Sequence, residues 1–76
     1  MVNLRYRKLA YNRVDVTVTE RDEVIGRIPL ERAVHGGWRT DGLIFDALRP
    51  GARELMFQAL DLATSALGQS RAVFTP

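Results

Sequence analysis

Basic and aromatic side chains alternate near the start of this 76-residue chain. The segment contains Arg5, Tyr6, Arg7, Lys8, Tyr11 and Arg13. Cationic side chains contact phosphates and aromatic rings stack on bases, so the pattern suits a nucleic-acid contact. Arginine and tyrosine are also over-represented among the residues that dominate protein–protein interfaces. The segment therefore has three interpretations: a solvated surface, a protein interface or a nucleic-acid contact.

The positive charge of the chain is an N-terminal feature. Eleven basic and nine acidic residues give a net charge of +2, which is too small to indicate nucleic-acid binding by itself. Residues 1–13 contain four of the basic residues and no acid, so this segment carries +4 and the remaining chain −2. Most of the basic residues are arginines, which reflects either a need for bidentate contacts or the codon usage of the genome.

Groups able to perform catalysis are few. The chain has no cysteine and one histidine, His35, and its serines at positions 65 and 70 have no evident base beside them. Glu20, Asp22 and Glu23 cluster where a turn is expected, and an exposed turn cannot separate two carboxyl pKa values for acid–base catalysis. We therefore expect a protein that is not an enzyme and has no metal or other cofactor, with His35 in a structural or surface role.

The length of the chain allows one hydrophobic core, so a single domain over residues 1–76 is expected. Small domains often depend on disulfides, a metal or a partner subunit. With no cysteine and one histidine, the sequence excludes the first two and leaves self-association or partner binding. The absence of cysteine and of a signal peptide indicates a cytoplasmic protein. No window approaches the roughly 18 consecutive apolar residues of a membrane-spanning helix, so no membrane partner is expected.

Two strands are expected over residues 13–19 and 23–28, joined by the turn Glu20-Arg21-Asp22. The first alternates apolar and polar residues, and the second should end at Pro29, because proline cannot donate to a strand ladder. A three-residue loop pairs Val14 with Ile28, Asp15 with Arg27 and Val18 with Val24. In this register Gly26 faces Val16, where it could admit a bulge or the close approach of another element.

The middle of the chain predicts a short helix and a second hairpin. Pro29 to His35 has proline at a first helical position, and Gly36-Gly37 follows as its stop. Residues 38–40 and 43–45 flank Asp41-Gly42, a dipeptide typical of two-residue hairpin turns, and this register places Trp38 opposite Phe45.

The clearest pattern is an amphipathic helix from Ala52 to Leu67, followed by Gly68 as a left-handed stop. At about 100° per residue, its apolar side chains fill one continuous arc of roughly 160°. Phe57 breaks the pattern, because it falls in the middle of the polar arc. It either folds under the N-terminal segment or residues 71–74, or stays exposed as an interface anchor, or is merely tolerated.

The N-terminal segment fits a strand better than a helix. Val2, Leu4 and Tyr6 then share one side and the residues between them the other, while Leu9 and Tyr11 invert the phase and imply a bulge near Lys8. The predicted fold is therefore α+β, with a small antiparallel sheet of three to five short strands in two hairpins, packed against one C-terminal amphipathic helix.

Two functions follow from these observations. The first is a small non-catalytic regulatory or accessory protein, such as an inhibitor, adaptor or modulator, that binds a larger protein partner, with a homodimer as a further option. The alternative is a DNA- or RNA-binding module that uses the basic N-terminal segment. The residues expected to contact the partner are Arg5, Tyr6, Arg7, Lys8, Tyr11, Arg13, Arg39 and Phe57.

The protein-binding interpretation ranks slightly higher, because acidic residues on the same predicted sheet would repel a phosphate backbone. These are Asp15, Glu20, Asp22 and Glu23. The order of strands followed by a helix resembles, in topology only, the three-stranded DNA-binding arms of phage integrases and the second half of double-stranded-RNA-binding domains. No residue signature of either family is present, so the resemblance assigns no functional positions.

Overall fold

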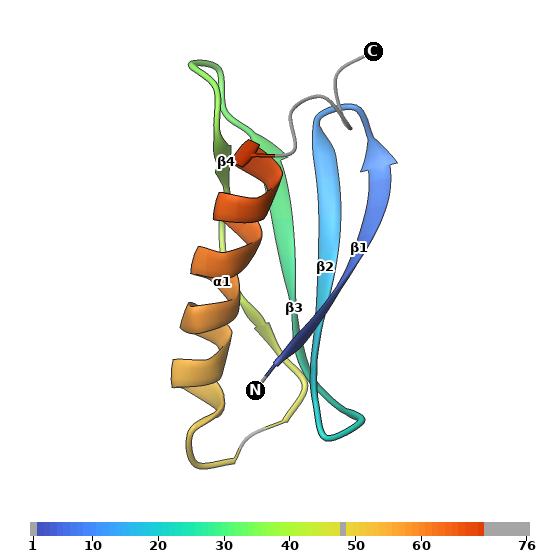
Figure 1. Cartoon of the computed structure of the whole chain (residues 1–76), viewed down its shortest axis with the longest axis vertical. Helices are drawn as coiled ribbons and strands as arrows, with labels where there is room; N and C mark the ends of the chain where they lie inside the picture. Colours follow the sequence, from blue (N-terminus) through green and yellow to red (C-terminus); the bar gives the residue numbers. More distant parts are fainter. Residues whose placement is uncertain (1, 48, 70–76) are drawn as a thin grey trace.

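The computed structural model describes residues 2–47 and 49–69 (Figure 1). Three long strands, β1 (Asn3–Ala10), β2 (Arg13–Glu20) and β3 (Glu23–Arg32), form an antiparallel meander. Two short strands, β4 (Trp38–Arg39) and β5 (Ile44–Phe45), pair with β3, and the helix α1 (Ala52–Gln69) packs on one face of the sheet. The predicted α+β class with one C-terminal helix is confirmed.

The core lies between α1 and the central strands. Alternate residues of β2 and β3 are buried against one stripe of the helix, since side chains of a strand point to opposite faces with a period of two. The buried residues are Val14, Val16, Val18, Ile25, Ile28, Leu30, Ala52, Met56, Ala59, Ala63 and Leu67. The alanines at the centre of the stripe let the helix lie close to the sheet.

The helix confirms the predicted amphipathic segment but extends beyond its expected end. It continues through Gly68 to Gln69, and the glycines with positive φ are Gly36, Gly37 and Gly51. Glycine permits the left-handed conformation without requiring it, so the predicted stop at Gly68 is wrong.

The N-terminal segment is a strand, as predicted. Strand β1 pairs with β2 from Asn3 opposite Thr19 to Ala10 opposite Arg13, with an irregularity between Lys8 and Ala10. The predicted bulge near Lys8 is therefore confirmed.

The β2–β3 hairpin has a tighter turn than predicted. Arg21 and Asp22 have φ of 52° and 64°, the left-handed conformations that a two-residue hairpin turn requires. The register then shifts between the pairs Thr19–Val24 and Val18–Gly26, which leaves Ile25 as an extra residue on β3.

The predicted pairs between β2 and β3 are therefore wrong by two residues. Val14 lies opposite Leu30 instead of Ile28, and Asp15 lies opposite Pro29 instead of Arg27. Because this displacement is even, Val14, Val18 and Ile28 remain on the buried face. Val24, which precedes the extra residue, was expected on that face but is 43% exposed, and Ile25 is buried in the core instead.

Gly26 admits the close approach of other elements, as predicted, although it lies opposite Val18 and not Val16. A Cβ atom placed on Gly26 would lie 2.5 Å from the carbonyl oxygen of Ile44 and 2.5 Å from Cε of Met56. This position therefore has no room for a side chain between β5 and α1.

Pro29 does not end β3, and the predicted helix from Pro29 to His35 is wrong. Strand β3 continues to Arg32, since β5 pairs with its residues 26–27 and β4 with residues 31–32, so Pro29 falls in the gap between them. A tight turn follows, in which Gly36 N–H donates to the carbonyl of Ala33 at 3.1 Å. Gly36 and Gly37 therefore belong to this turn and do not end a helix.

The hairpin predicted around Asp41-Gly42 is also wrong. Trp38 pairs with Arg32 and Phe45 pairs with Gly26, so β4 and β5 follow one another along the same edge of β3. They form one interrupted strand, and the Asp41-Gly42 dipeptide lies in the interruption. Pairing with the long β3 on both sides of the interruption outweighs the local preference of that dipeptide for a hairpin turn.

Candidate functional site

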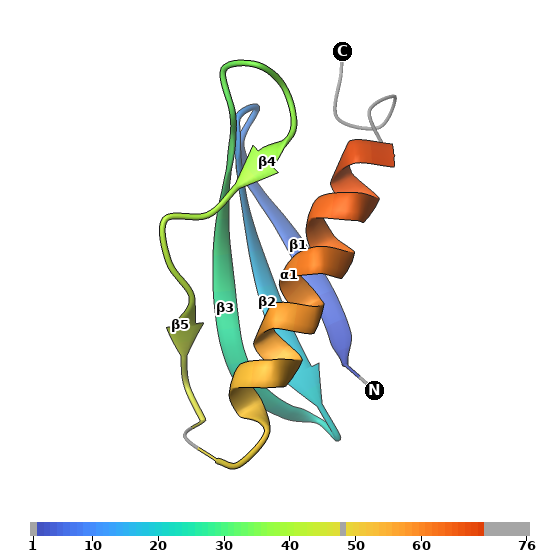
Figure 2. The same cartoon turned by 90° about the vertical axis from the view of Figure 1, so that its left-hand side faces the viewer.

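The two faces of the sheet differ because α1 covers only one of them (Figure 2). On the uncovered face, the alternation and register of the strands gather five of the ten arginines. We call this surface the arginine face. It comprises Asn3, Arg5 and Arg7 of β1, Arg13, Asp15, Thr17 and Thr19 of β2, Val24, Arg27, Pro29 and Glu31 of β3, Arg39 of β4 and Ile44 of β5.

Cross-strand neighbours bring distant arginines together on this face. Arg5 lies opposite Thr17, which lies opposite Arg27, so one row crosses all three long strands. A second row joins Arg13, Glu31 and Arg39. Four residues of the predicted contact set, Arg5, Arg7, Arg13 and Arg39, therefore share one surface.

The positive charge on the arginine face is neutralised at one side only. Arg27 Nε lies 3.7 Å from Asp46 Oδ2, and Arg39 Nη2 lies 3.7 Å from Glu31 Oε1. Among residues 2–47 and 49–69, Arg5, Arg7 and Arg13 take part in no ion pair. The available charge is therefore concentrated on β1 and β2.

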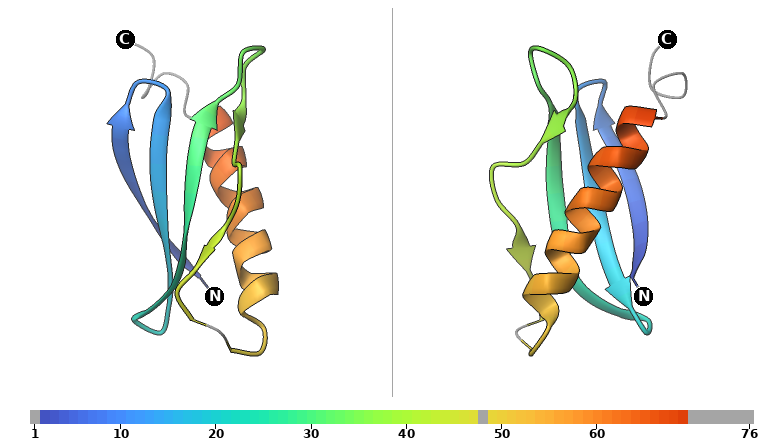
Figure 3. Two further views of the ribbon diagram at one scale, coloured as in Figure 1. Left: turned by 180° about the vertical axis from the view of Figure 1, so that it is seen from behind. Right: turned by 60° about the vertical axis from the view of Figure 1, so that its left-hand side comes forward.

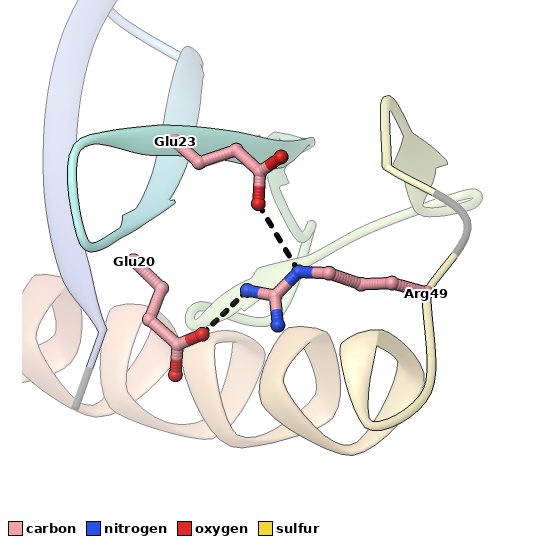
Figure 4. A network of polar contacts seen from close by, with 3 residues as sticks. All are labelled: Glu20, Glu23 and Arg49. Atoms are coloured by element: carbon pink, nitrogen blue, oxygen red, sulfur yellow. Dashed lines mark hydrogen bonds and ion pairs between the residues drawn. The ribbon is translucent and has the colours of Figure 1, made fainter.

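Two of the acids expected to oppose an anionic partner lie on the other face. Glu20 and Glu23 pair with each other across the hairpin, and both contact Arg49, which precedes α1 (Figure 4). Arg49 Nη2 donates a hydrogen bond to Glu20 Oε1, and its Nε lies 3.2 Å from Glu23 Oε1. Glu20 and Glu23 therefore lie on the sheet, as expected, but on the face opposite the arginines, whereas Asp15 lies among the arginines, opposite Arg7.

The cluster of Glu20, Glu23 and Arg49 is more than a solvated turn. The side chain of Glu20 is only 16% exposed. The hydrogen bond from Arg49 holds the pKa of the Glu20 carboxyl below its usual value, and the same bond raises the pKa of the Arg49 guanidinium. The cluster ties the segment before α1 to the ends of β2 and β3.

The tyrosines and lysine of the predicted contact set are separated from the arginines. Tyr6 and Lys8 lie opposite Val16 and Val14, which places them on the helix side of β1. Burial raises the pKa of the Tyr6 phenol above its ordinary value. Tyr11 lies in the β1–β2 turn and is 72% exposed. The interleaved sequence therefore does not form one mixed surface.

Phe57 is 48% exposed on α1, so the prediction that the N-terminal segment covers it is wrong. The other prediction, that residues 71–74 cover it, concerns residues outside those that the structure describes. The guanidinium carbon of Arg53 lies 5.7 Å from the centre of its ring. Arg53 also lines a largely apolar hollow between α1 and β5, together with Phe45, Ala47, Arg49 and Ala52.

We call Phe45, Ala47, Arg53 and Phe57 the aromatic patch. Phe45 is 37% exposed and belongs to β5, which runs beside the first turns of α1 while β1 lies on the other side of the helix (Figures 2 and 3). Sequence reasoning missed Phe45, because it assigned this ring a contact with Trp38. The correct signal was the length of β3, which provides Gly26 as its partner.

No protein-family model, curated protein or solved structure matches this chain. Its function is therefore inferred from the two surfaces described above.

The turn between β3 and β4 holds the histidine. His35 is exposed there, near Arg32, whose guanidinium carbon lies 5.0 Å from the centre of the Trp38 ring. Among the described residues, no three His, Cys, Asp or Glu side chains come close enough to hold a metal ion. Within residues 2–47 and 49–69, no helix is long and apolar enough to cross a membrane.

Proposed function

We propose that this chain is a non-catalytic accessory or regulatory protein that binds a larger protein partner through the aromatic patch. The observation that carries the proposal is a pair of partly exposed phenylalanine rings joined by Arg53: Phe45 lines the apolar hollow with Arg53, and Arg53 lies over the ring of Phe57. Removing a phenylalanine side chain from water stabilises a complex by about 1.5–3 kcal/mol when burial is complete. Buried aromatic anchors of this kind dominate the energy of protein interfaces.

The cation beside the rings indicates the chemistry of the partner. Arg53 is exposed, lies over Phe57 and takes part in no ion pair among the described residues, whereas Arg49 is occupied by Glu20 and Glu23. A partner would therefore present an apolar side chain to the hollow and a carboxylate to Arg53. Charge complementarity of this kind contributes mainly to specificity and association rate.

The patch is held in place by the fold. Phe45 is fixed by pairing with Gly26, and the next residue, Asp46, donates its N–H to the carbonyl of Ile25 at 3.0 Å. Phe57 stands on a helix that is anchored by buried neighbours such as Met56. Binding to such a surface requires little ordering of the backbone, which favours affinity.

A photocrosslinking residue at position 54, which is exposed on α1 next to the patch, combined with capture from the native host, tests this proposal. We expect the wild-type patch to crosslink one protein that mass spectrometry identifies, and Phe57→Ser to abolish its capture. The matched control is Leu62→Ser, since Leu62 is 49% exposed on the same helix but lies about 140° around its axis from Phe57.

Capture that survives Phe57→Ser, or that Leu62→Ser abolishes equally, would show that the patch does not bind the partner. Light scattering on the purified chain adds a second criterion. If the crosslinked species is another copy of this chain, the patch is a homodimer interface and the proposal of a larger partner is wrong.

A further inference from the structure

We propose a second binding surface, in which the β1–β2 part of the arginine face binds the phosphate backbone of double-stranded DNA. Arg5, Arg7 and Arg13 supply the cations, and the ribbon formed by β1 and β2 enters the major groove. This surface is separate from the aromatic patch and does not depend on the protein partner proposed above.

The charge on these two strands supports an anionic partner. Arg5, Arg7 and Arg13 take part in no ion pair among the described residues, while Asp15 is the single acid of β1 and β2 on this face. The excess is positive, and neutralising phosphates with such cations releases the counterions that surround a duplex. Arg27 and Arg39, farther across the sheet, already pair with Asp46 and Glu31.

Strands β1 and β2 form one edge of the sheet, and because β2 also pairs with β3, this edge is the part of the sheet that can enter a groove. Strand β1 is the outermost strand in the order β1-β2-β3-β4, so among the described residues no strand pairs with its outer edge. The major groove of B-form DNA is about 12 Å wide and admits a two-stranded ribbon, whose strands lie about 4.8 Å apart. The major groove of an RNA duplex is too narrow for such an element, which favours DNA.

The neighbours of the arginines favour a duplex over a single strand or an acidic protein. Asn3, Thr17 and Thr19 are small and polar, and such side chains can donate to phosphates or base edges. Binding of single strands relies on aromatic platforms, but Tyr6 points to the opposite face of β1 and Tyr11 lies in the turn. Protein interfaces need a desolvated apolar anchor, and the exposed apolar residues that the register places on this face, Val24 opposite Thr19 and Ile44 opposite Arg27, lie on β3 and β5 and not on the strands that carry Arg5, Arg7 and Arg13.

The test is fluorescence anisotropy of the full chain with a labelled 20-bp DNA duplex, titrated between about 50 and 200 mM salt. Contacts by three arginines predict that log affinity falls with log salt with a slope of about −2.7, from about 0.9 per phosphate. Arg5→Gln with Arg7→Gln should reduce the magnitude of that slope by about 1.8 and weaken binding at least about tenfold at low salt. The variant Arg5→Lys with Arg7→Lys should retain the wild-type slope.

The matched control is Lys8→Gln with Arg21→Gln, which removes the same charge from the opposite face of β1 and from the β2–β3 turn. It should bind the duplex like the wild type, as should Phe57→Ser, so failure of this proposal is distinct from failure of the protein-binding proposal. The proposal is overturned by absence of binding at 50 mM salt, by a flat salt response, or by equal losses in the control. Equal or tighter binding of poly-glutamate, of a single strand or of an RNA duplex also overturns it, because the surface would then select another anion.

Discussion

The arginine face exposes charged groups and the aromatic patch exposes apolar rings, and exposing an apolar ring costs the fold more free energy. An exposed arginine keeps its head group hydrated, so Arg5 or Arg7 on the uncovered sheet needs no partner for the fold to be stable. An exposed phenylalanine loses the favourable burial that the core gives to residues such as Met56. The exposed rings of the patch therefore indicate a bound protein by themselves. On the arginine face, the exposed side chains need no partner, and only the arrangement of their charges indicates an anionic one.

The two surfaces also depend on different parts of the fold. The relevant arginines lie on β1 and β2, which pair from Asn3 opposite Thr19 to Ala10 opposite Arg13. The patch combines β5 with α1 and depends on the close approach of both at Gly26. Changes at Gly26 should therefore disturb the patch before they disturb the arginine face.

Among the three test substitutions, Gly26→Ala, Glu20→Gln and Phe57→Ser, the largest effect on stability is expected from Gly26→Ala. A Cβ atom would collide with the carbonyl oxygen of Ile44 and with the end of Met56, both at 2.5 Å, so β5 or α1 must shift. Overpacking of this kind lowers the free energy of unfolding by about 1–3 kcal/mol, which urea unfolding measures.

Gly42→Ala provides the control, because nothing lies within 4 Å of its added Cβ atom. Its stability should stay within about 0.5 kcal/mol of the wild type. Gly26→Ala should also reduce partner capture while the affinity for DNA is maintained at temperatures where the variant is folded. If it impairs DNA binding more than partner capture, the two surfaces are not independent in the way described.

A smaller effect is expected from acid, through the Glu20–Arg49 contact. The folded-state pKa of Glu20 is lowered from 4.5, so the contact stabilises the fold above that pH and is lost as pH falls through the lower, folded pKa. Glu20→Gln should be less stable than the wild type at pH 7 and should lose less stability on acidification.

Urea unfolding at pH 7 and pH 3 measures both changes, and Asp61→Gln is a suitable control because Asp61 lies exposed on α1 outside this cluster. The same pH dependence in Glu20→Gln and the wild type would show that the contact does not stabilise the fold.

The smallest effect on stability is expected from Phe57→Ser. The ring lies outside the core and contacts Arg53, so its removal should change the free energy of unfolding by no more than about 0.5 kcal/mol. Met56→Ala, one residue earlier but fully buried, should lower it by about 2–5 kcal/mol. Similar losses in the two variants, measured by urea unfolding, would mean that Phe57 has a structural role and would remove the main support for the patch.

Local periodicity predicted the parts of the molecule that depend on one element. The alternation of β1 separated Arg5 and Arg7 from Tyr6, and the helical period of α1 identified Phe57 as misplaced. Grouping Tyr6 with the arginines nevertheless followed their proximity in sequence and not the alternation of the strand. The structure separates them because neighbouring residues of a strand point to opposite faces.

Long-range pairing decided the rest, and the sequence indicated it poorly. Pro29 suggested that β3 ends early and that a helix follows, and the Asp41-Gly42 dipeptide suggested a hairpin with the wrong Trp38–Phe45 pair. The missing N–H of Pro29 is tolerated because β4 and β5 leave that part of the edge unpaired. The location of Phe45 beside α1 follows only from the longer β3, so half of the aromatic patch could not be found from local patterns.

The central claim is that the aromatic patch and the arginine face bind different partners independently. The most direct test measures partner capture and DNA affinity in the same preparations of Phe57→Ser and of Arg5→Gln with Arg7→Gln. We expect Phe57→Ser to lose the protein partner and bind DNA like the wild type, and the double arginine variant to show the reverse. Loss of both activities in either folded variant, or of neither in both, would contradict the claim.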